Sequence, residues 1–160
     1  MAPRHRFVVD INVGRLAKWL RVMGYDTLFP RGSNDNDLVR LALREERVLV
    51  TRDRGIGLRR AVRQGQMQVV QIVHDDFRRQ LRQLVRALDL DLEGGFTRCV
   101  RCNDPLNPVP REDVENRLPP YVFRHHRQFM ECPRCLRIYW RGTHWTNMSA
   151  ELDGVYQEAG

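Results

Sequence analysis

Short apolar runs alternate with stripes of helical period over the first 90 residues of the chain. Each run is long enough for a short buried strand, and the segment after it repeats apolar positions as on one face of a helix. Strands that alternate with helices are typical of an α/β domain with a largely parallel sheet. The predicted strands are Phe7–Val9, Thr27–Phe29, Val48–Val50 and Gln68–Val73.

Helical segments follow all of these strands. The first ends at Gly24, because a glycine just beyond the last turn commonly terminates a helix. The second opens with the capping residues of SNDND, and the last has arginines on the face opposite its apolar stripe. The apolar stripes comprise Val13, Leu16, Leu20 and Met23; Leu38, Leu41 and Ala42; Leu58 and Val62; and Phe77, Leu81, Leu84, Val85 and Leu88.

The pattern changes at Gly94-Gly95, which we interpret as a linker. Beyond it the helical periodicity is lost, and residues 97–145 contain all four cysteines and six of the eight prolines. A segment this short cannot bury much apolar surface, so we predict a small module that needs another source of stability. The predicted organisation is an α/β domain over 1–92, the cysteine module over 93–147 and a C-terminal tail over 148–160.

The cysteines form two CxxC pairs, Cys99 with Cys102 and Cys132 with Cys135, separated by 29 residues. Each pair can close a tight turn that presents two thiolates, and two such turns complete the tetrahedral set of structural zinc. Metal binding would also stabilise a module without a large core. The spacing favours a zinc ribbon with structural Zn²⁺ over two unrelated reduced pairs or redox dithiols.

The chain has a formal net charge of +7, and Lys18 is its only lysine. This charge indicates a polyanionic partner, and a guanidinium can donate two hydrogen bonds to one phosphate. No apolar run is long enough to span a membrane, and the N-terminus lacks the apolar stretch of a signal peptide. The sequence therefore predicts a cytoplasmic protein without a membrane partner. In such a protein, four cysteines are typical of metal ligands or free thiols and not of disulfides.

Aspartates recur at the positions where the predicted strands end. They are Asp10 after the first strand, Asp53 after the third, Asp75 and Asp76 after the fourth, and Asp35 and Asp37 at the start of the second helix. If the first and third strands are neighbours, their aspartates meet at the carboxyl edge, where parallel sheets bind ligands. A set of carboxylates without Cys or His is the kind of ligand set that Mg²⁺ or Mn²⁺ needs. Such ions can activate water for the hydrolysis of a phosphodiester. Each aspartate alone also fits a helix N-cap, and this alternative stays open.

The stretch YWRGTHW mixes arginine with aromatic rings near the end of the cysteine module. Arg141, His144 and Trp145 are candidates for RNA contacts, because aromatic faces stack on unpaired bases while arginine holds phosphates. Aromatic rings can instead pack the module against the α/β domain, and we expect this of Tyr139 and Trp140.

Several segments together resemble the Mut7-C family, a PIN-like ribonuclease fold fused to a zinc ribbon. They are FVVDINVGRLAKWLRVMGYDT, DNDLVRLALREERVLVTRDRG, the two CxxC pairs, PPYV and YWRGTHW, in this order from about residue 7 to residue 147. The resemblance implies a PIN-like parallel sheet flanked by helices and a Mg²⁺- or Mn²⁺-dependent ribonuclease acting on single-stranded or structured RNA. It assigns acidic positions to Asp10, Asp37 and Asp53, a fourth to Asp75, and phosphate contacts to Arg15, Arg52 and Arg54.

Two functions follow from these features. The first is a metal-dependent ribonuclease whose α/β domain, over 1–92, cuts RNA and whose ribbon, over 93–147, helps to hold it. The second is a non-catalytic RNA-binding adaptor with a vestigial acidic site. A phospho-acceptor or phosphatase domain fits less well, because receiver domains need a lysine after a later strand and Lys18 lies in the first helix.

Overall fold

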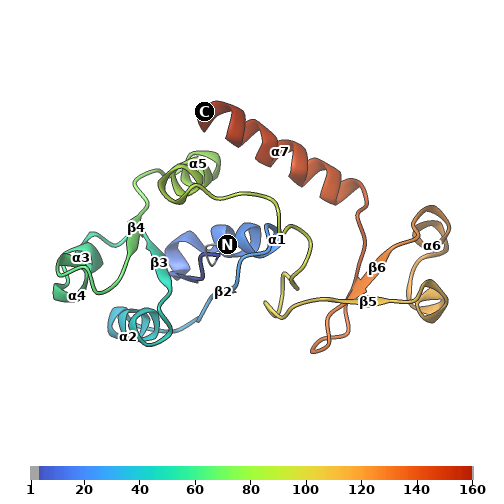
Figure 1. Cartoon of the computed structure of the whole chain (residues 1–160), viewed down its shortest axis with the longest axis horizontal. Coiled ribbons are helices and arrows are strands. Elements are labelled where there is room, and N and C mark those ends of the chain that lie inside the picture. The colour runs from blue at the N-terminus through green and yellow to red at the C-terminus, as the bar shows by residue number, and fades with distance from the viewer. Residues whose placement is uncertain (1–3, 160) are drawn as a thin grey trace.

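The computed structural model describes residues 4–159, except the side chains of His144, Met148 and residues 156–159. Four parallel strands form a sheet in the order β2-β1-β3-β4 (Figure 1). The strands are β1 (Phe7–Val9), β2 (Thr27–Leu28), β3 (Val48–Thr51) and β4 (Val69–Gln71). The predicted α/β fold with a parallel sheet is confirmed, and the pairing of β1 with β3 brings the residues after these strands to one edge.

Helices flank the sheet, and a 3₁₀ turn (Ile11–Val13) precedes the first of them. They are α1 (Gly14–Val22), α2 (Asp35–Glu45), α3 (Arg54–Gly57), α4 (Arg60–Arg63), α5 (Phe77–Leu88), α6 (Pro120–His125) and α7 (Thr143–Ala159). The single helix expected through Leu58 and Val62 is wrong. The segment forms α3 and α4 instead, because glycine occupies two of the four positions of α3 and disfavours a helix by about 1 kcal/mol each. Within the described chain, no helix is both long and apolar enough to cross a membrane.

Alternate residues of β1 face two separate apolar cores. Phe7 and Val9 belong to the larger core, which α1, α5 and α7 cover on one face of the sheet. Val8 faces the smaller core, where Leu38 of α2 and Ile56 of α3 pack on the opposite face. The sheet is therefore covered on both faces, as is usual for parallel strands.

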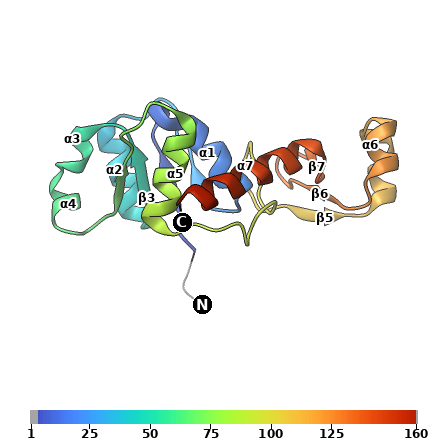
Figure 2. The ribbon, with the colours of Figure 1, turned by 90° about the horizontal axis from the view of Figure 1, so that it is seen from above.

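The C-terminal segment returns to the α/β domain. Helix α7 runs back from the cysteine module along α5 (Figures 1 and 2), and Leu152 and Val155 are 1% and 2% exposed in the larger core. The described part of the tail expected over 148–160 continues this helix. Apolar residues recur in the sequence of this helix at the spacing of one helical face, so its signal was present but was missed. They are Trp145, Met148, Leu152 and Val155. The division at residues 92 and 93 stays a prediction.

The cysteine module contains an antiparallel sheet in the order β5-β6-β7. Its strands are β5 (Asn107–Val109), β6 (Phe129–Glu131) and β7 (Ile138–Tyr139). Two 3₁₀ turns (Arg111–Asp113 and Glu115–Arg117) and α6 form the connection between β5 and β6. Its core cluster consists of Cys99, Leu106 and Cys132, while Val114 and Phe129 are buried outside this cluster, so the module depends on its cysteines for a core.

Candidate functional site

Asp10 lies at the end of β1 and is 7% exposed. Its Oδ1 accepts a hydrogen bond from the backbone N–H of Ile11 at 2.7 Å. Its Oδ2 accepts one from the hydroxyl of Thr51 at 2.8 Å. Because Thr51 ends the neighbouring strand β3, this bond joins two strand ends at the carboxyl edge of the sheet.

Asp53 follows β3 and caps α3. Its Oδ1 accepts a hydrogen bond from the backbone N–H of Gly55 at 2.7 Å, so the predicted alternative of an N-cap exists here. The backbone N–H of Asp53 donates to the hydroxyl oxygen of Thr51 at 3.0 Å. Thr51 therefore connects Asp53 to Asp10, since its hydroxyl donates to one aspartate and accepts from the other.

A third carboxylate, that of Asp35 in the first turn of α2, lies close enough to the other two for their charges to act on it. A hydrogen bond with Asp53 raises the pKa of Asp35, and partial burial and the negative charges of Asp53 and Asp10 raise it further. We call Asp10, Asp35 and Asp53 the acidic edge. Like charges held together in this way favour the binding of a compensating cation.

Asp37 lies outside the acidic edge. Its side chain is exposed, and its backbone N–H donates to Oδ1 of Asn34 at 2.9 Å. Within the described residues its carboxylate has no hydrogen bond or ion pair. Residues two apart on a helix point in different directions, so Asp35 and Asp37 cannot both face the sheet. The structure brings Asp35 to Asp53, although the resemblance assigned the second acidic position to Asp37.

Asp75, the predicted fourth acidic residue, forms an ion pair with Arg52. The Asp75 side chain is 91% exposed, so this pair lies in water. The backbone N–H of Arg52 donates to Oδ1 of Asn12 at 3.2 Å, which holds this part of the chain beside the end of β1. An exposed ion pair contributes little to stability and opens easily, so Arg52 can exchange Asp75 for a phosphate.

Two further predicted phosphate contacts are exposed. Arg15 lies in the first turn of α1, and its guanidinium carbon is 4.2 Å from the centre of the Phe77 ring. Arg54 begins α3 directly after Asp53. Positive side chains therefore follow both Asp10 and Asp53 along the chain.

The acidic edge offers oxygen ligands, but these oxygens do not converge on one position where an ion could bind. Within the described part of the chain, only the four cysteines bring three or more ligand atoms within 4.8 Å of one another. An ion at the acidic edge would require Asp35 and Asp53 to turn toward Asp10, whose two oxygens are held by hydrogen bonds. A donor set made only of oxygen suits Mg²⁺ or Mn²⁺.

The four cysteines form a compact cluster. The Sγ atoms of Cys99, Cys102, Cys132 and Cys135 lie within 4.8 Å of one another. The backbone N–H of Cys102 donates to Sγ of Cys99 at 3.3 Å, and that of Cys135 donates to Sγ of Cys132 at 3.5 Å. Such bonds stabilise thiolates, so this set can hold a tetrahedral zinc ion.

The crowding of the thiols shifts their acidities in opposite directions. Burial raises the pKa of Cys99, but hydrogen bonds from Tyr139 and from backbone N–H groups outweigh it and lower this pKa to about 7. Burial and the neighbouring thiol of Cys135 raise the pKa of Cys102 to about 12. Four sulfur atoms this close become thiolates together only when a cation balances them, which is the chemistry of structural zinc.

The profile of the Mut7-C RNAse domain matches residues 5–152, nearly the whole chain. The chain belongs to the Mut7-C RNAse domain family. Comparisons with curated proteins and with solved structures gave no match. The matched region of this Mut7-C domain includes the acidic edge and all four cysteines, so the family resemblance of the sequence motifs is confirmed.

The first cysteine turn of the Mut7-C domain, Cys99–Cys102, is bonded to the α/β domain. Arg21 of α1 donates to the carbonyl oxygens of Val100 at 2.9 Å and of Arg101 at 3.2 Å. The chain between the two cysteines is therefore anchored to α1. This contact keeps the cysteine cluster against the larger core, on which Val100 packs.

The predicted RNA contacts of the cysteine module lie where β7 leads into α7. Trp145 packs against Phe96 with ring centres 5.1 Å apart, and the guanidinium carbon of Arg141 is 5.2 Å from the Trp145 ring. Tyr139 also packs against Phe96, edge to face at 6.3 Å. The His144 side chain lies outside the described residues. The RNA contacts of Arg141, His144 and Trp145 stay predictions.

Sequence reasoning missed Thr51. Its hydroxyl connects the two aspartates after β1 and β3, and the residue is fully buried. A polar residue at the end of the otherwise apolar strand VLVT is the signal that could have identified it, because a buried hydroxyl needs a hydrogen-bond partner.

Proposed function

We propose that this Mut7-C domain is a metal-dependent ribonuclease that hydrolyses RNA phosphodiester bonds at the acidic edge. The main support is that the Thr51 hydroxyl joins Asp10 and Asp53 where β1 and β3 end, and that the charges of both aspartates act on Asp35. Membership of an RNAse domain family adds to it. Mg²⁺ or Mn²⁺ held by these carboxylates would supply the positive charge that activates water and stabilises the leaving oxygen.

Residues around the acidic edge orient the reacting groups. Thr51 and the backbone N–H of Ile11 fix both oxygens of Asp10, so its direction does not depend on the ion. Arg52 and Arg54, on either side of Asp53 in the chain, bind phosphates next to the scissile bond.

The cysteine module contributes stability and RNA affinity in this proposal. Zn²⁺ bound by the four cysteines holds the module together, and the net charge of +7 attracts single-stranded or structured RNA. A reducing cytoplasm suits four free cysteines that serve as metal ligands.

A non-catalytic RNA-binding adaptor is the second candidate. Hydrogen bonds within the fold already use oxygens of Asp10 and Asp53, and this favours a structural role for both. Such an adaptor would bind RNA with the same salt dependence but would not cleave it, so cleavage separates the two functions.

The test is cleavage of end-labelled RNA by zinc-loaded protein with Mn²⁺, with EDTA and after Asp53→Asn. Asparagine retains the helix cap, so the variant keeps its fold, but it removes the charge that a hard cation needs. We expect cleavage to fall by orders of magnitude while RNA binding persists. Equal cleavage by both proteins, or cleavage that EDTA does not affect, would overturn the nuclease assignment. Binding by wild type without cleavage under either metal supports the adaptor.

A further inference from the structure

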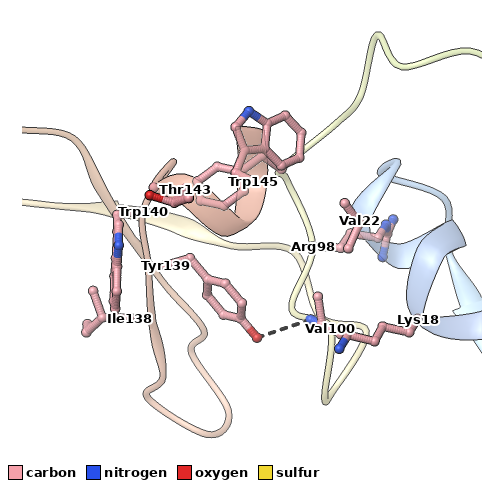
Figure 3. A pocket seen from close by; sticks show the side chains of 11 residues that line it. Lys18, Val22, Arg98, Val100, Ile138, Tyr139, Trp140, Thr143 and Trp145 are labelled. Atoms are coloured by element: carbon pink, nitrogen blue, oxygen red, sulfur yellow. Dashed lines mark hydrogen bonds between the residues drawn. The ribbon is translucent and has the colours of Figure 1, made fainter. Parts of the chain in front are cut away.

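A pocket of about 230 Å³ lies between α1 and the last strand of the cysteine module (Figure 3). Aromatic side chains form much of its wall, and aliphatic groups from both sides complete it. The wall includes Phe96, Tyr139, Trp140 and Trp145, together with Val22 and Val100. A planar apolar ring is the kind of group that such a wall accepts by stacking.

The aromatic rings of this wall are held in place. The Tyr139 hydroxyl lies 3.0 Å from Sγ of Cys99 and accepts a hydrogen bond from the backbone N–H of Val100 at 3.1 Å (Figure 3). Trp140 approaches the backbone of Gly142 so closely that a Cβ there would lie 2.9 Å from its Nε1. The pocket is therefore formed in advance, and the cysteine cluster orients one of its rings.

Lys18, the only lysine of the chain, lines the same pocket. Its side chain extends from α1 toward Val100 (Figure 3) and is exposed. Within the described residues, Lys18 has no hydrogen bond or ion pair. An ammonium group beside an aromatic pocket, without a partner of its own, is available to an anionic group of a bound molecule.

The positive charge continues from this pocket toward the acidic edge. Arg15 and Lys18 are three positions apart on α1, so their side chains are neighbours on one face of the helix. The nine residues of α1 span about 13 Å, from a start four positions after Asp10 to an end at Val22 in the pocket wall. One short helix therefore connects the pocket with the acidic edge.

We propose that this pocket binds one unpaired base of the RNA substrate while Lys18 holds a neighbouring phosphate. The RNA backbone between that base and the scissile phosphate then runs along α1. The proposal rests on the proposed ribonuclease function, to which it adds a preference for single-stranded RNA next to the cut. The pocket is smaller than the roughly 300–1,000 Å³ of sites for larger ligands, and its charge is opposite to that of RNA.

Binding of fluorescein-labelled oligouridylate is measured in EDTA, where metal-dependent cleavage does not occur. The comparison ligands are the abasic ribose-phosphate oligomer of equal length and an RNA duplex. Wild type should bind oligouridylate about 5- to 150-fold more tightly than the abasic oligomer, the range of one stacked base. In Trp140→Leu, which keeps an apolar wall but removes the stacking ring, the difference should shrink toward equality.

Lys18→Gln is the second variant, because an exposed side chain can change without affecting folding. It should weaken oligouridylate binding and reduce the slope of log affinity against log salt by about 0.7, the value for one phosphate contact on a single strand. Arg40→Gln on α2 is the matched control for the loss of one exposed charge. It should leave the preference for bases unchanged and should not reproduce the effect of Lys18→Gln. The duplex should bind no more tightly to wild type than to Trp140→Leu.

A preference for bases that survives Trp140→Leu, or a salt slope that Lys18→Gln does not reduce, overturns the base pocket, even if the protein cleaves RNA. Conversely, a preference that Trp140→Leu abolishes and a slope that Lys18→Gln reduces, in a protein without Mn²⁺-dependent cleavage, retain the pocket and overturn the ribonuclease. If neither variant changes RNA binding but Trp140→Leu abolishes self-association or capture of a purified protein, the pocket is a protein-docking site and the proposal is wrong.

Discussion

The backbone N–H of Thr27 donates a hydrogen bond to Oδ1 of Asn103 at 2.8 Å, and this bond joins the edge strand β2 to the first cysteine turn. Both residues are buried, and Nδ2 of Asn103 also donates to Oδ1 of Asp26 at 2.8 Å. Asn103 therefore supplies the partner that an edge strand otherwise lacks. Since α7 follows the cysteine module and packs on α5, the module is held to the α/β domain through this helix as well as through the first cysteine turn.

Zinc removal should consequently destabilise the whole chain. In Cys132→Ser we expect the zinc content to fall from about one ion per chain and the calorimetric transition to move down as one cooperative unit. Loss of zinc loosens the turn that holds Asn103 against β2. Calorimetry and metal analysis of the same samples check this. A variant with a second transition at the wild-type temperature would show that the α/β domain folds independently.

Asn103→Gly should lower the free energy of unfolding by about 1–3 kcal/mol, because the Thr27 N–H is left buried without an acceptor. Glycine tolerates the backbone at this position, where φ is 71°, so strain does not contribute to the loss. Urea unfolding measures the effect. Gly65, which has a φ of 72° and open space where a Cβ would lie, offers the control Gly65→Asn, which should cost far less.

Asp26 should make stability depend on pH below about 4. Burial alone would raise its pKa, but hydrogen bonds from Arg47 and Asn103 outweigh burial and lower it from 3.8 to about 2. Because the folded pKa is depressed, the ionised carboxylate stabilises the fold at neutral pH by about 2 kcal/mol, and this contribution disappears as the pH falls toward 2.

The comparison of wild type with Asp26→Asn isolates this effect, because both proteins lose zinc to acid alike. Their difference in unfolding free energy should be constant from pH 7 to about pH 5 and should shrink between pH 4 and pH 2. Urea titrations at each pH supply the values. A difference that does not vary with pH would mean that Asp26 stabilises the fold through shape and not through charge.

The same substitution should have effects at Asp35 that it does not have at Asp37. The raised pKa of Asp35 means that its ionised form is disfavoured by the fold, so Asp35→Asn should increase thermal stability at pH 7. The same change should abolish Mn²⁺-dependent RNA cleavage if Asp35 holds the ion. Asp37→Asn, two positions away and exposed, is the matched control and should change neither property. Loss of cleavage in Asp37→Asn alone would restore the assignment that the family resemblance made.

Much of the fold could be predicted from the sequence because its signals are local. The apolar runs of β1 and β3 and the stripe of α5 identify their elements by spacing alone, and the C′ glycine at position 24 adopts the expected positive φ of 90°. The CxxC pairs likewise identify a possible metal cluster, since two cysteines within one turn must lie close together. The candidate aspartates at strand ends follow from chain order and the parallel sheet.

Only the tertiary structure decided which of these groups meet. The choice between Asp35 and Asp37 depends on the rotation of α2 about its axis, which is set by the packing of Leu38 and Ala42 against β1 and β3. The apolar stripe of α7, which includes Leu152 and Val155, predicts a helix, but only the tertiary structure shows that this helix packs along α5. These relationships join residues far apart in the sequence, and contacts of that kind depend on the packing of whole elements, which local spacing does not encode.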